Sequence, residues 1–397
     1  MEVEDGLFDV AVIGAGPAGS TLSALLAARS FRVALLDRDV FPRDKLCGEF
    51  LSYDALPLLE ALGVRSTLEE AGATRISTCR VVGSRRTYSF PLPAEARGIS
   101  RMALDAMLAG RAIGLGAVSF EGTTVESIES DSERSVIRGK RRDGSPVNIS
   151  ARVVAGAWGR WGRIDRQLGR AFVEDHQHRH FGFKRHYLAT DRDDRSTIDL
   201  YAFGDGYLGV SAIENNRINI CGLVHASRLE GNKGGWSGFV SRLIEDSQPL
   251  AALFQNHQPA QEEFLSSEPV IFAAKSAVER GIVMVGDASG LVDPLAGNGM
   301  AMGIQSAFSA ATSLTGYLRG RFDRRSMEAE YERAFFDLFA SRIRWSRRIA
   351  RLLSRPRLLD RGLPLARSEG IGKFLVARTR ASSAMVARLL QAWESAV

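Results

Sequence analysis

Cysteine is scarce in this chain of 397 residues, and long apolar runs are missing. There are only three cysteines, Cys47, Cys79 and Cys221, and an odd, small number cannot form a disulfide framework. This favours reduced thiols in a cytoplasmic protein. No apolar run approaches the ~18 residues that predict a transmembrane helix. The acidic start at 1–6 does not resemble a secretory signal, so no signal peptide is expected.

Several familiar site patterns are also missing. The sequence contains no recognisable P-loop, Ser-His-Asp arrangement or nucleic-acid-binding module. The composition, 45% hydrophobic and 25% charged, is typical of a globular protein, and the length predicts two or three folding units. The net charge of +6 is modest and is carried mostly by arginine, so no nucleic-acid partner is predicted.

The most informative segment lies near the amino terminus, where the apolar run 8–13 leads into the pattern G-x-G-x-x-G. In such a pattern the first glycine makes a tight turn, the second lets the backbone approach a pyrophosphate, and the third lets a helix pack on the sheet; here they are Gly14, Gly16 and Gly19. The following helix directs its N-terminal amides at the phosphates. A second apolar run, 32–36, leads to Asp37, the acid expected to hold the ribose hydroxyls. This order predicts a βαβ unit that binds an adenine dinucleotide.

A second informative segment, Gly286–Met300, follows the apolar run 281–285. It places Asp287 at the end of a predicted strand, ahead of a proline- and glycine-containing loop that leads into a helix. The carboxylate can accept hydrogen bonds from a polyol chain, and the helix N-terminus can face an electron-rich group. The ribityl chain and the pyrimidine edge of a flavin meet both requirements, and the helix dipole would stabilise the reduced ring.

With these motifs in order, residues 8–320 resemble the flavoproteins of the aromatic-hydroxylase fold, in the branch that contains geranylgeranyl reductases and flavin-dependent halogenases. The resemblance implies an α/β fold, in which a mainly antiparallel substrate-facing sheet interrupts a Rossmann-like FAD-binding domain and a helical C-terminal tail follows. The implied FAD-binding segments are 1–78, 99–172 and 273–320, the substrate-sheet segments are 79–98 and 173–272, and the helical region is 321–397.

The resemblance also implies which residues hold the cofactor, and it narrows the dinucleotide from NAD or FAD to FAD. These residues are Gly14, Ala15, Gly16, Pro17, Ala18, Gly19, Asp37 and Arg38 in the first motif; Arg43, Lys45 and Cys47 in the loop that passes near the flavin ring; Arg101; Val125 in the strand beside the adenine; and Gly286, Asp287, Pro294, Gly297, Asn298, Gly299 and Met300 in the loop under the ring.

Three side chains are candidates for catalysis, and each has a plainer alternative. Cys47 is either a proton donor or a small packed side chain. Glu49 is either a proton relay or a solvated or capping carboxylate. Tyr207 either hydrogen-bonds a substrate oxygen or packs within its strand. No metal is predicted, because the histidines at 176, 178 and 180 share one face of a strand but lie in a strongly polar stretch.

Two departures from the family pattern bear on the reaction. Related hydroxylases carry an Asp-Gly pair where this chain has Trp158-Gly159, and an indole cannot accept hydrogen bonds as a carboxylate does. The electron donor therefore stays open between NAD(P)H and a partner reductase or other electron-transfer protein. Gly209 and Val210 occupy the region where the branch tends to carry tryptophans, and the W-x-W-x-I-P pattern of halogenases is absent. Halogenation is disfavoured on this ground.

The resemblance and these departures favour a monooxygenase of secondary metabolism that hydroxylates an aromatic or polyketide-like lipophilic substrate through a peroxyflavin. Two alternatives stay open. One is the reduction of C=C bonds in an isoprenoid lipid, with Cys47 near the transfer site. The other is a non-catalytic flavin-bearing protein that binds a lipid or a partner.

The segment 341–357 carries seven arginines and no acid, beside apolar residues at helical spacing. One interpretation is an ordinary surface helix that packs on the body of the protein. The other is an interfacial helix that brings an otherwise cytoplasmic protein into peripheral contact with anionic lipid.

Overall fold

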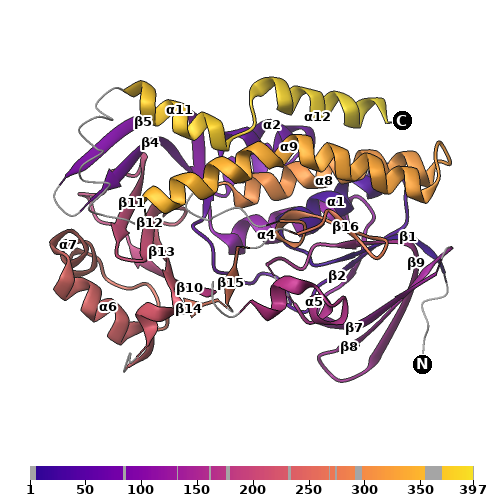
Figure 1. The fold of residues 1–397 in the computed structure, drawn as a ribbon, viewed down its shortest axis with the longest axis horizontal. Coiled ribbons are helices and arrows are strands. Elements are labelled where there is room, and N and C mark those ends of the chain that lie inside the picture. Colours follow the sequence, from indigo (N-terminus) through magenta and orange to yellow (C-terminus); the bar gives the residue numbers. More distant parts are fainter. Residues whose placement is uncertain are drawn as a thin grey trace.

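The computed structural model describes residues 6–83, 86–131, 133–160, 162–175, 179–230, 234–267, 269–272, 275–290, 297–353 and 369–396. Two β-sheets organise these residues, and long helices cross them (Figure 1). The helices are α1 (Pro17–Ala27), α2 (Leu56–Ala61), α3 (Arg65–Glu70), α4 (Arg101–Gly114), α5 (Arg163–Gln167), α6 (Gly235–Asp246), α7 (Gln248–Asn256), α8 (Gly299–Leu318), α9 (Arg324–Leu353), α11 (Glu369–Thr379) and α12 (Ser383–Ser395).

The first sheet has a parallel centre, because its strands are apolar on both faces and are covered on both sides. Its order is β16 (Val278–Glu279), β17 (Ile282–Met284), β9 (Pro146–Gly156), β1 (Phe8–Ile13), β2 (Val33–Leu36) and β6 (Val118–Phe120), and the antiparallel strands β7 (Thr123–Ser130) and β8 (Ser135–Arg141) extend from β9. α1, α4 and α8 pack together in the largest core cluster. The dinucleotide turn and the strand end at β17 thus meet at one edge of this sheet.

The second sheet is mainly antiparallel, and polar and apolar residues alternate at the start of its strand 217–225. Its order is β14 (Leu265–Ser266), β10 (Arg179–Leu188), β13 (Arg217–His225), β12 (Gly206–Ile213), β11 (Thr197–Phe203), β4 (Thr74–Val82), β5 (Thr87–Gly98) and β3 (Phe50–Leu51), and β15 (Val270–Ile271) also pairs with β10. α6 and α7 join one apolar cluster of this sheet, which is centred on Phe183 and Phe239. A separate cluster, which includes Phe50, Cys79 and Phe90, meets α9 and α11 through Ile349 and Val376.

The C-terminal helices belong to the body of the protein. Figure 1 shows α9 running alongside α8, with α11 near β4 and β5. The hydroxyl of Tyr331 donates to the carbonyl of Met284 at 2.7 Å, which ties α9 to the end of β17. Arg342 is buried and donates to Gln305 at 2.7 Å, and burial lowers its pKa to about 10. Arg342 therefore does not belong to an exposed basic face, although the sequence pattern grouped it with the other arginines of segment 341–357.

The expected architecture is confirmed: an α/β domain with a parallel sheet, a second and mainly antiparallel sheet, and helices at the C-terminus. The segment boundaries stay predictions. Within the residues that the structure describes, no helix is both long and apolar enough to span a bilayer.

Candidate functional site

The glycines of the first motif are required by close backbone contacts. Gly14 has a φ of +108°, and a Cβ there would lie 2.4 Å from the carbonyl oxygen of Ala157. A Cβ on Gly19 would lie 1.8 Å from the carbonyl oxygen of Gly14. At Gly16 a Cβ would meet only a guanidinium nitrogen of Arg101, at 3.6 Å. The turn is thus closely packed at Gly14 and Gly19 but open at Gly16. The N-terminus of α1 has no side-chain cap. This is a cradle in which backbone amides can receive a diphosphate.

A network of buried charges surrounds this cradle. Asp37 accepts a hydrogen bond from the amide of Ala15 at 2.7 Å, so its carboxylate is fixed against the turn. Arg43 lies 3.5 Å from Asp37 and donates to Asp105 at 2.8 Å. Arg101 donates to both oxygens of Asp105, at 2.7 and 2.6 Å. Asp105 is fully buried and orients both arginines. It is missing from the residues predicted from the sequence, although its i, i+4 spacing from Arg101 is a readable signal.

The cradle also contains Lys45, which lies close to Arg43 and Arg101. Burial, followed by the charges of the two arginines, lowers the pKa of Lys45 to about 8. Three cationic groups therefore gather near two carboxylates, and the surplus positive charge suits a dianionic diphosphate. Arg38 lies apart from this group: its side chain is 63% exposed and faces Asp39.

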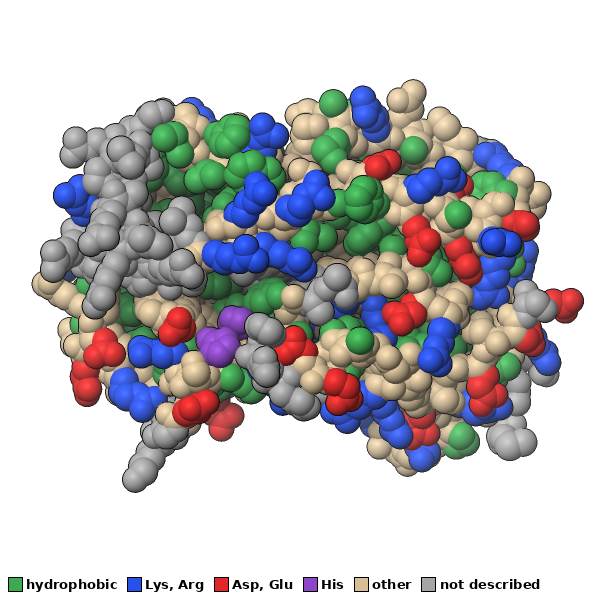
Figure 2. Space-filling view, in the orientation of Figure 1, with side chains coloured by type: hydrophobic (Ala, Val, Ile, Leu, Met, Phe, Trp, Pro, Cys, Tyr) green, Lys and Arg blue, Asp and Glu red, His purple; other side chains and the backbone are tan. Residues whose placement is uncertain are grey.

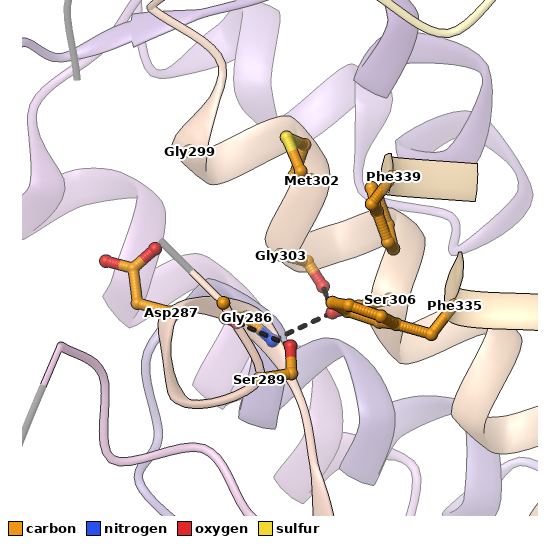
Figure 3. A pocket seen from close by; sticks show the side chains of 10 residues that line it. Gly286, Asp287, Ser289, Gly299, Met302, Gly303, Ser306, Phe335 and Phe339 are labelled. Atoms are coloured by element: carbon orange, nitrogen blue, oxygen red, sulfur yellow. Dashed lines mark hydrogen bonds between the residues drawn. The ribbon is translucent and has the colours of Figure 1, made fainter. Parts of the chain in front are cut away.

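The second motif packs directly against the first. Gly286 has a φ of +62°, and a Cβ there would lie 2.9 Å from the Cβ of Ala18. Its amide donates to the hydroxyl of Ser306 at 2.9 Å, which joins the turn to α8. Figure 3 shows this turn beside a small pocket whose far side is formed by Phe335 and Phe339 of α9. The carboxylate of Asp287 points away from those rings.

The beginning of α8 completes this part of the site. Gly297 has a φ of +58° and faces the ring of Phe50, and Asn298 precedes the first turn of α8 without capping it by a side chain. The side-chain nitrogen Nδ2 of Asn298 donates instead to the carbonyl of Thr379 at 2.6 Å. Met300 is buried in the core at the start of the helix. Pro294 lies outside the described residues.

These features fit FAD. The uncapped first turn of α1 and the cations beside it suit the diphosphate. Asp287, which lies 3.6 Å from Arg160 and is one-third exposed, offers carboxylate oxygens to a polyol at the other end of the site. The uncapped N-terminus of α8 suits the pyrimidine edge of the ring. Val125 is buried in β7 among the apolar residues of the first sheet, and its contact with adenine stays a prediction.

A second buried network is centred on Glu49. This residue is fully buried and has a φ of +55°, an unfavourable conformation for a non-glycine residue. One carboxylate oxygen accepts from the amide of Arg101 at 2.8 Å and from the ammonium of Lys184 at 2.6 Å. The other oxygen lies 2.7 Å from Nε2 of His186. The expectation of a solvated carboxylate is therefore wrong, whereas the capping role is confirmed at the first amide of α4.

The partners of Glu49 come from the second sheet. Lys184 and His186 alternate along β10, so both side chains lie on one face of that strand. Burial opposes the charge of Lys184, but the carboxylates of Glu49 and Asp44 raise its pKa above the ordinary value. Sequence reasoning missed both residues. The available signal was a pair of basic side chains at a spacing of two, and it was weak because the same strand also contains Arg179, His180 and Arg185.

The loop that carries Cys47 is clamped between the two sheets. Asn219 donates to the carbonyl of Cys47, and Ser211 donates to the carbonyl of Gly48, each at 3.0 Å. Ser211 and Asn219 are directly paired across β12 and β13, so the second sheet presents both donors at one place. The thiol of Cys47 is half-buried and accepts from the amide of Glu49 at 3.4 Å. The thiol is therefore held near the buried network, and its catalytic role stays a prediction.

Tyr207 and Trp158 both have packing roles. Tyr207 packs beside two apolar clusters of the second sheet, and its contact with a substrate stays a prediction. Trp158 donates from its indole nitrogen to the buried Asp165 at 3.0 Å. The same carboxylate pairs with Arg170, which donates to the carbonyl of Ala288 at 2.9 Å. The residue that replaces the usual Asp is thus built into the support of the second motif.

No cluster of three or more potential metal ligands occurs in the part of the chain that the structure describes. His176 and His178 lie outside the described residues. His180 packs edge-to-face on His225, with ring centroids 5.1 Å apart.

Comparison with known proteins agrees with this geometry. The model of a family described as FAD binding domain matches residues 8–335. The menaquinone reductase of Mycobacterium tuberculosis is 27% identical over 386 residues, which cover 92% of this chain and 88% of that protein. Tryptophan 2-halogenase of Chondromyces crocatus is 23% identical over 85% of this chain, and the matched region spans 66% of the halogenase. The match to conditioned medium factor receptor 1 of Dictyostelium discoideum spans 64% of that protein.

Solved structures share the fold at low identity. The flavin-dependent brominase Bmp2 has a TM-score of 0.77 and 18% identity, covering 98% of this chain and 99% of its own. A geranylgeranyl bacteriochlorophyll reductase-like protein from Thermoplasma acidophilum has the same score, identity and coverage.

We expect Asp287→Ala to weaken FAD binding by about 10- to 150-fold, because hydrogen bonds to a charged acceptor contribute about 1.5–3 kcal/mol. Titrating the apoprotein with FAD and following the quenching of flavin fluorescence measures the affinity. Asp337→Ala, at an exposed position on α9, is the matched control. Equal affinities of the two variants would contradict the placement of the ribityl chain at Asp287.

We also expect FAD affinity to fall as the pH rises above about 8, the pKa of Lys45, because only the protonated amine attracts the diphosphate. One linked proton limits this decrease to about tenfold per pH unit. Lys45→Met should bind FAD more weakly at pH 7 and lose this pH dependence, whereas Lys45→Arg should keep the affinity at pH 9. A dependence that survives in Lys45→Met would assign it to another group.

Proposed function

This chain belongs to the FAD binding domain family, and on that premise we propose that it is an FAD-dependent oxidoreductase that hydroxylates a lipophilic aromatic substrate with O₂. The observation that carries this proposal is the buried network of Glu49, Lys184 and His186 beside the loop that resembles the flavin-facing loop of the family. When bound, FAD supplies the two electrons that activate O₂. The overall reaction consumes O₂, two electrons and two protons, and it yields the hydroxylated ring and water.

In this reaction the chain has to handle protons away from bulk water. The carboxylate of Glu49 lies between a protonated lysine and an imidazole, and all three side chains are buried. His186 can exchange a proton with Glu49 through their 2.7 Å contact. A phenolic substrate that loses its proton to such a group becomes richer in electrons, and its ring is then more reactive toward an oxygen electrophile. Lys184 pairs with the carboxylate of Glu49 at 2.6 Å and holds it in place.

The surroundings of the network suit a lipophilic ring. The apolar cluster of β4, β5 and β11 includes Phe50, Phe90 and Ile198, and Tyr207 packs against it. Phe50 follows Glu49 directly and faces Gly297 at the start of α8. An apolar surface thus adjoins both the proton-handling group and the expected place of the flavin ring, which supports an aromatic substrate with apolar substituents.

Reduction of a C=C bond is the second candidate. Cys47 lies in the clamped loop next to Glu49, whose backbone amide donates to the Cys47 sulfur, and a thiol at this place can deliver a proton to carbon. The match to menaquinone reductase covers 92% of this chain and 88% of that protein, which also favours this candidate. Halogenation has less support: the similar halogenase structures are 16–20% identical and share only the fold, and the W-x-W-x-I-P pattern of halogenases is absent from the sequence.

Oxygen dependence separates the candidates. We expect anaerobically reduced, FAD-loaded protein to consume O₂ faster when alkylphenols are present, and to incorporate one atom of ¹⁸O from ¹⁸O₂ into the product. The control is the same experiment with a menaquinone under nitrogen. Product formation from the quinone without O₂ would establish reduction instead. If the reduced protein reacts with O₂ no faster than free reduced FAD, whatever phenol is offered, the hydroxylase proposal fails.

We expect Glu49→Gln to lower kcat by about 10²- to 10³-fold, because the amide keeps the hydrogen bond to the backbone of Arg101 but cannot take a proton. FAD affinity should change less than threefold. Glu69→Gln, which removes a charge from the pair with Arg97, is the matched control. An unchanged kcat in Glu49→Gln would leave Glu49 with a structural role only.

A further inference from the structure

The end of α9 and the neighbouring α11 present aromatic and basic side chains on one exposed surface, which we call the α9–α11 face. Trp345 and Phe374 pack edge-to-face, with ring centroids 5.9 Å apart. The guanidinium of Arg348 lies 5.3 Å from the ring of Trp345, and that of Arg378 lies 4.8 Å from the ring of Phe374. Phe374 nevertheless stays 47% exposed, and Ile371 stays 40% exposed. The face therefore combines a cluster of apolar rings with cations that surround it.

The charge of the α9 part of this surface has one sign. From Leu338 to Leu353 the sequence contains no Asp or Glu, and it contains five arginines. Arg342 is buried, whereas Arg344 and Arg348 are exposed. Figure 2 shows Lys and Arg side chains gathered beside hydrophobic side chains over this part of the molecule. About two turns earlier in α9 than Arg344, the ring of Phe336 is also 65% exposed.

Such a surface matches the chemistry of a bilayer interface. Aromatic rings with a polar edge or a nearby cation are favoured at the level of the lipid headgroups. Arginine binds phosphate through two parallel hydrogen bonds, and a leaflet rich in anionic lipid attracts clustered basic residues. We propose that the α9–α11 face docks on a membrane surface that contains anionic phospholipid, with Trp345 and Phe374 inserted among the headgroups.

The position of the face gives this docking a consequence. α11 packs on β5, where Gly372 contacts the ring of Phe90. Ile349 of α9 and Val376 of α11 pack on the same apolar cluster that contains Phe50 and adjoins Tyr207. The docked face therefore lies over the apolar part of the candidate site. On the proposed function, this is the side from which a lipophilic ring dissolved in the bilayer reaches the site.

Vesicle co-sedimentation tests the docking without any turnover. We expect the FAD-loaded full chain to bind vesicles of phosphatidylcholine with 30% phosphatidylglycerol at least tenfold more tightly than vesicles of phosphatidylcholine alone. The double variant Arg344→Glu/Arg348→Glu should lose at least tenfold of that binding. The double variant Arg141→Glu/Arg142→Glu makes the same change of charge in an exposed hairpin, and it should bind within twofold of the unmodified chain.

The aromatic contribution is tested by Trp345→Ser/Phe374→Ser. This variant should bind the anionic vesicles at low salt but release them at a lower salt concentration than the unmodified chain does. Equal loss of binding in the two charge variants would reduce the effect to net charge and overturn the proposal, as would equal binding of all variants. Vesicle binding is measured without substrate, so a failure of the hydroxylase assay would not affect the outcome of this test.

Discussion

Two buried carboxylates, Asp105 and Glu49, hold the site together. Each lies in the protein interior, where an unpaired charge is strongly destabilising, and each is paired with basic side chains of which at least one comes from another element. Asp105 fixes Arg43 and Arg101 beside the dinucleotide turn, and Glu49 binds Lys184 and His186 of the second sheet. The backbone amide of Arg101 donates to Glu49 while its side chain pairs with Asp105, so the two networks meet at the first residue of α4. The relative position of the two sheets depends on this junction.

This junction explains why the loop between β2 and β3 has so many fixed points. Arg43 and Lys45 lie at the cradle, whereas the carbonyl of Cys47 accepts from Asn219 of the second sheet and the side chain of Glu49 binds Lys184 there. The loop therefore serves as the common wall of the cofactor site and the candidate catalytic site. The left-handed conformation of Glu49 is sustained because its hydrogen bonds and ion pairs together outweigh the local strain.

The C-terminal helices close the molecule through a third buried polar group. Arg342 of α9 reaches Gln305 of α8 and lies 3.4 Å from Asp54, and the same carboxylate accepts from the amide of Ala381 ahead of α12. Asn298 joins the group through Thr379. The start of α8, where the flavin ring is expected, is thus held in place by contacts with the C-terminal helices. The same tail exposes Arg344 and Arg348 on the α9–α11 face.

The sequence alone determined the dinucleotide turn, the second motif and the α/β class, because these depend on local requirements: glycines at close contacts, apolar runs for buried parallel strands, and an acid at a strand end. It also identified Glu49 and Cys47 as candidates, but it did not determine their surroundings. Only the tertiary structure brought Lys184 and His186 to Glu49, Asp105 to Arg43, and Arg342 into the core. Those contacts join residues 37 to 288 positions apart, and no local pattern encodes which distant cation neutralises a buried carboxylate.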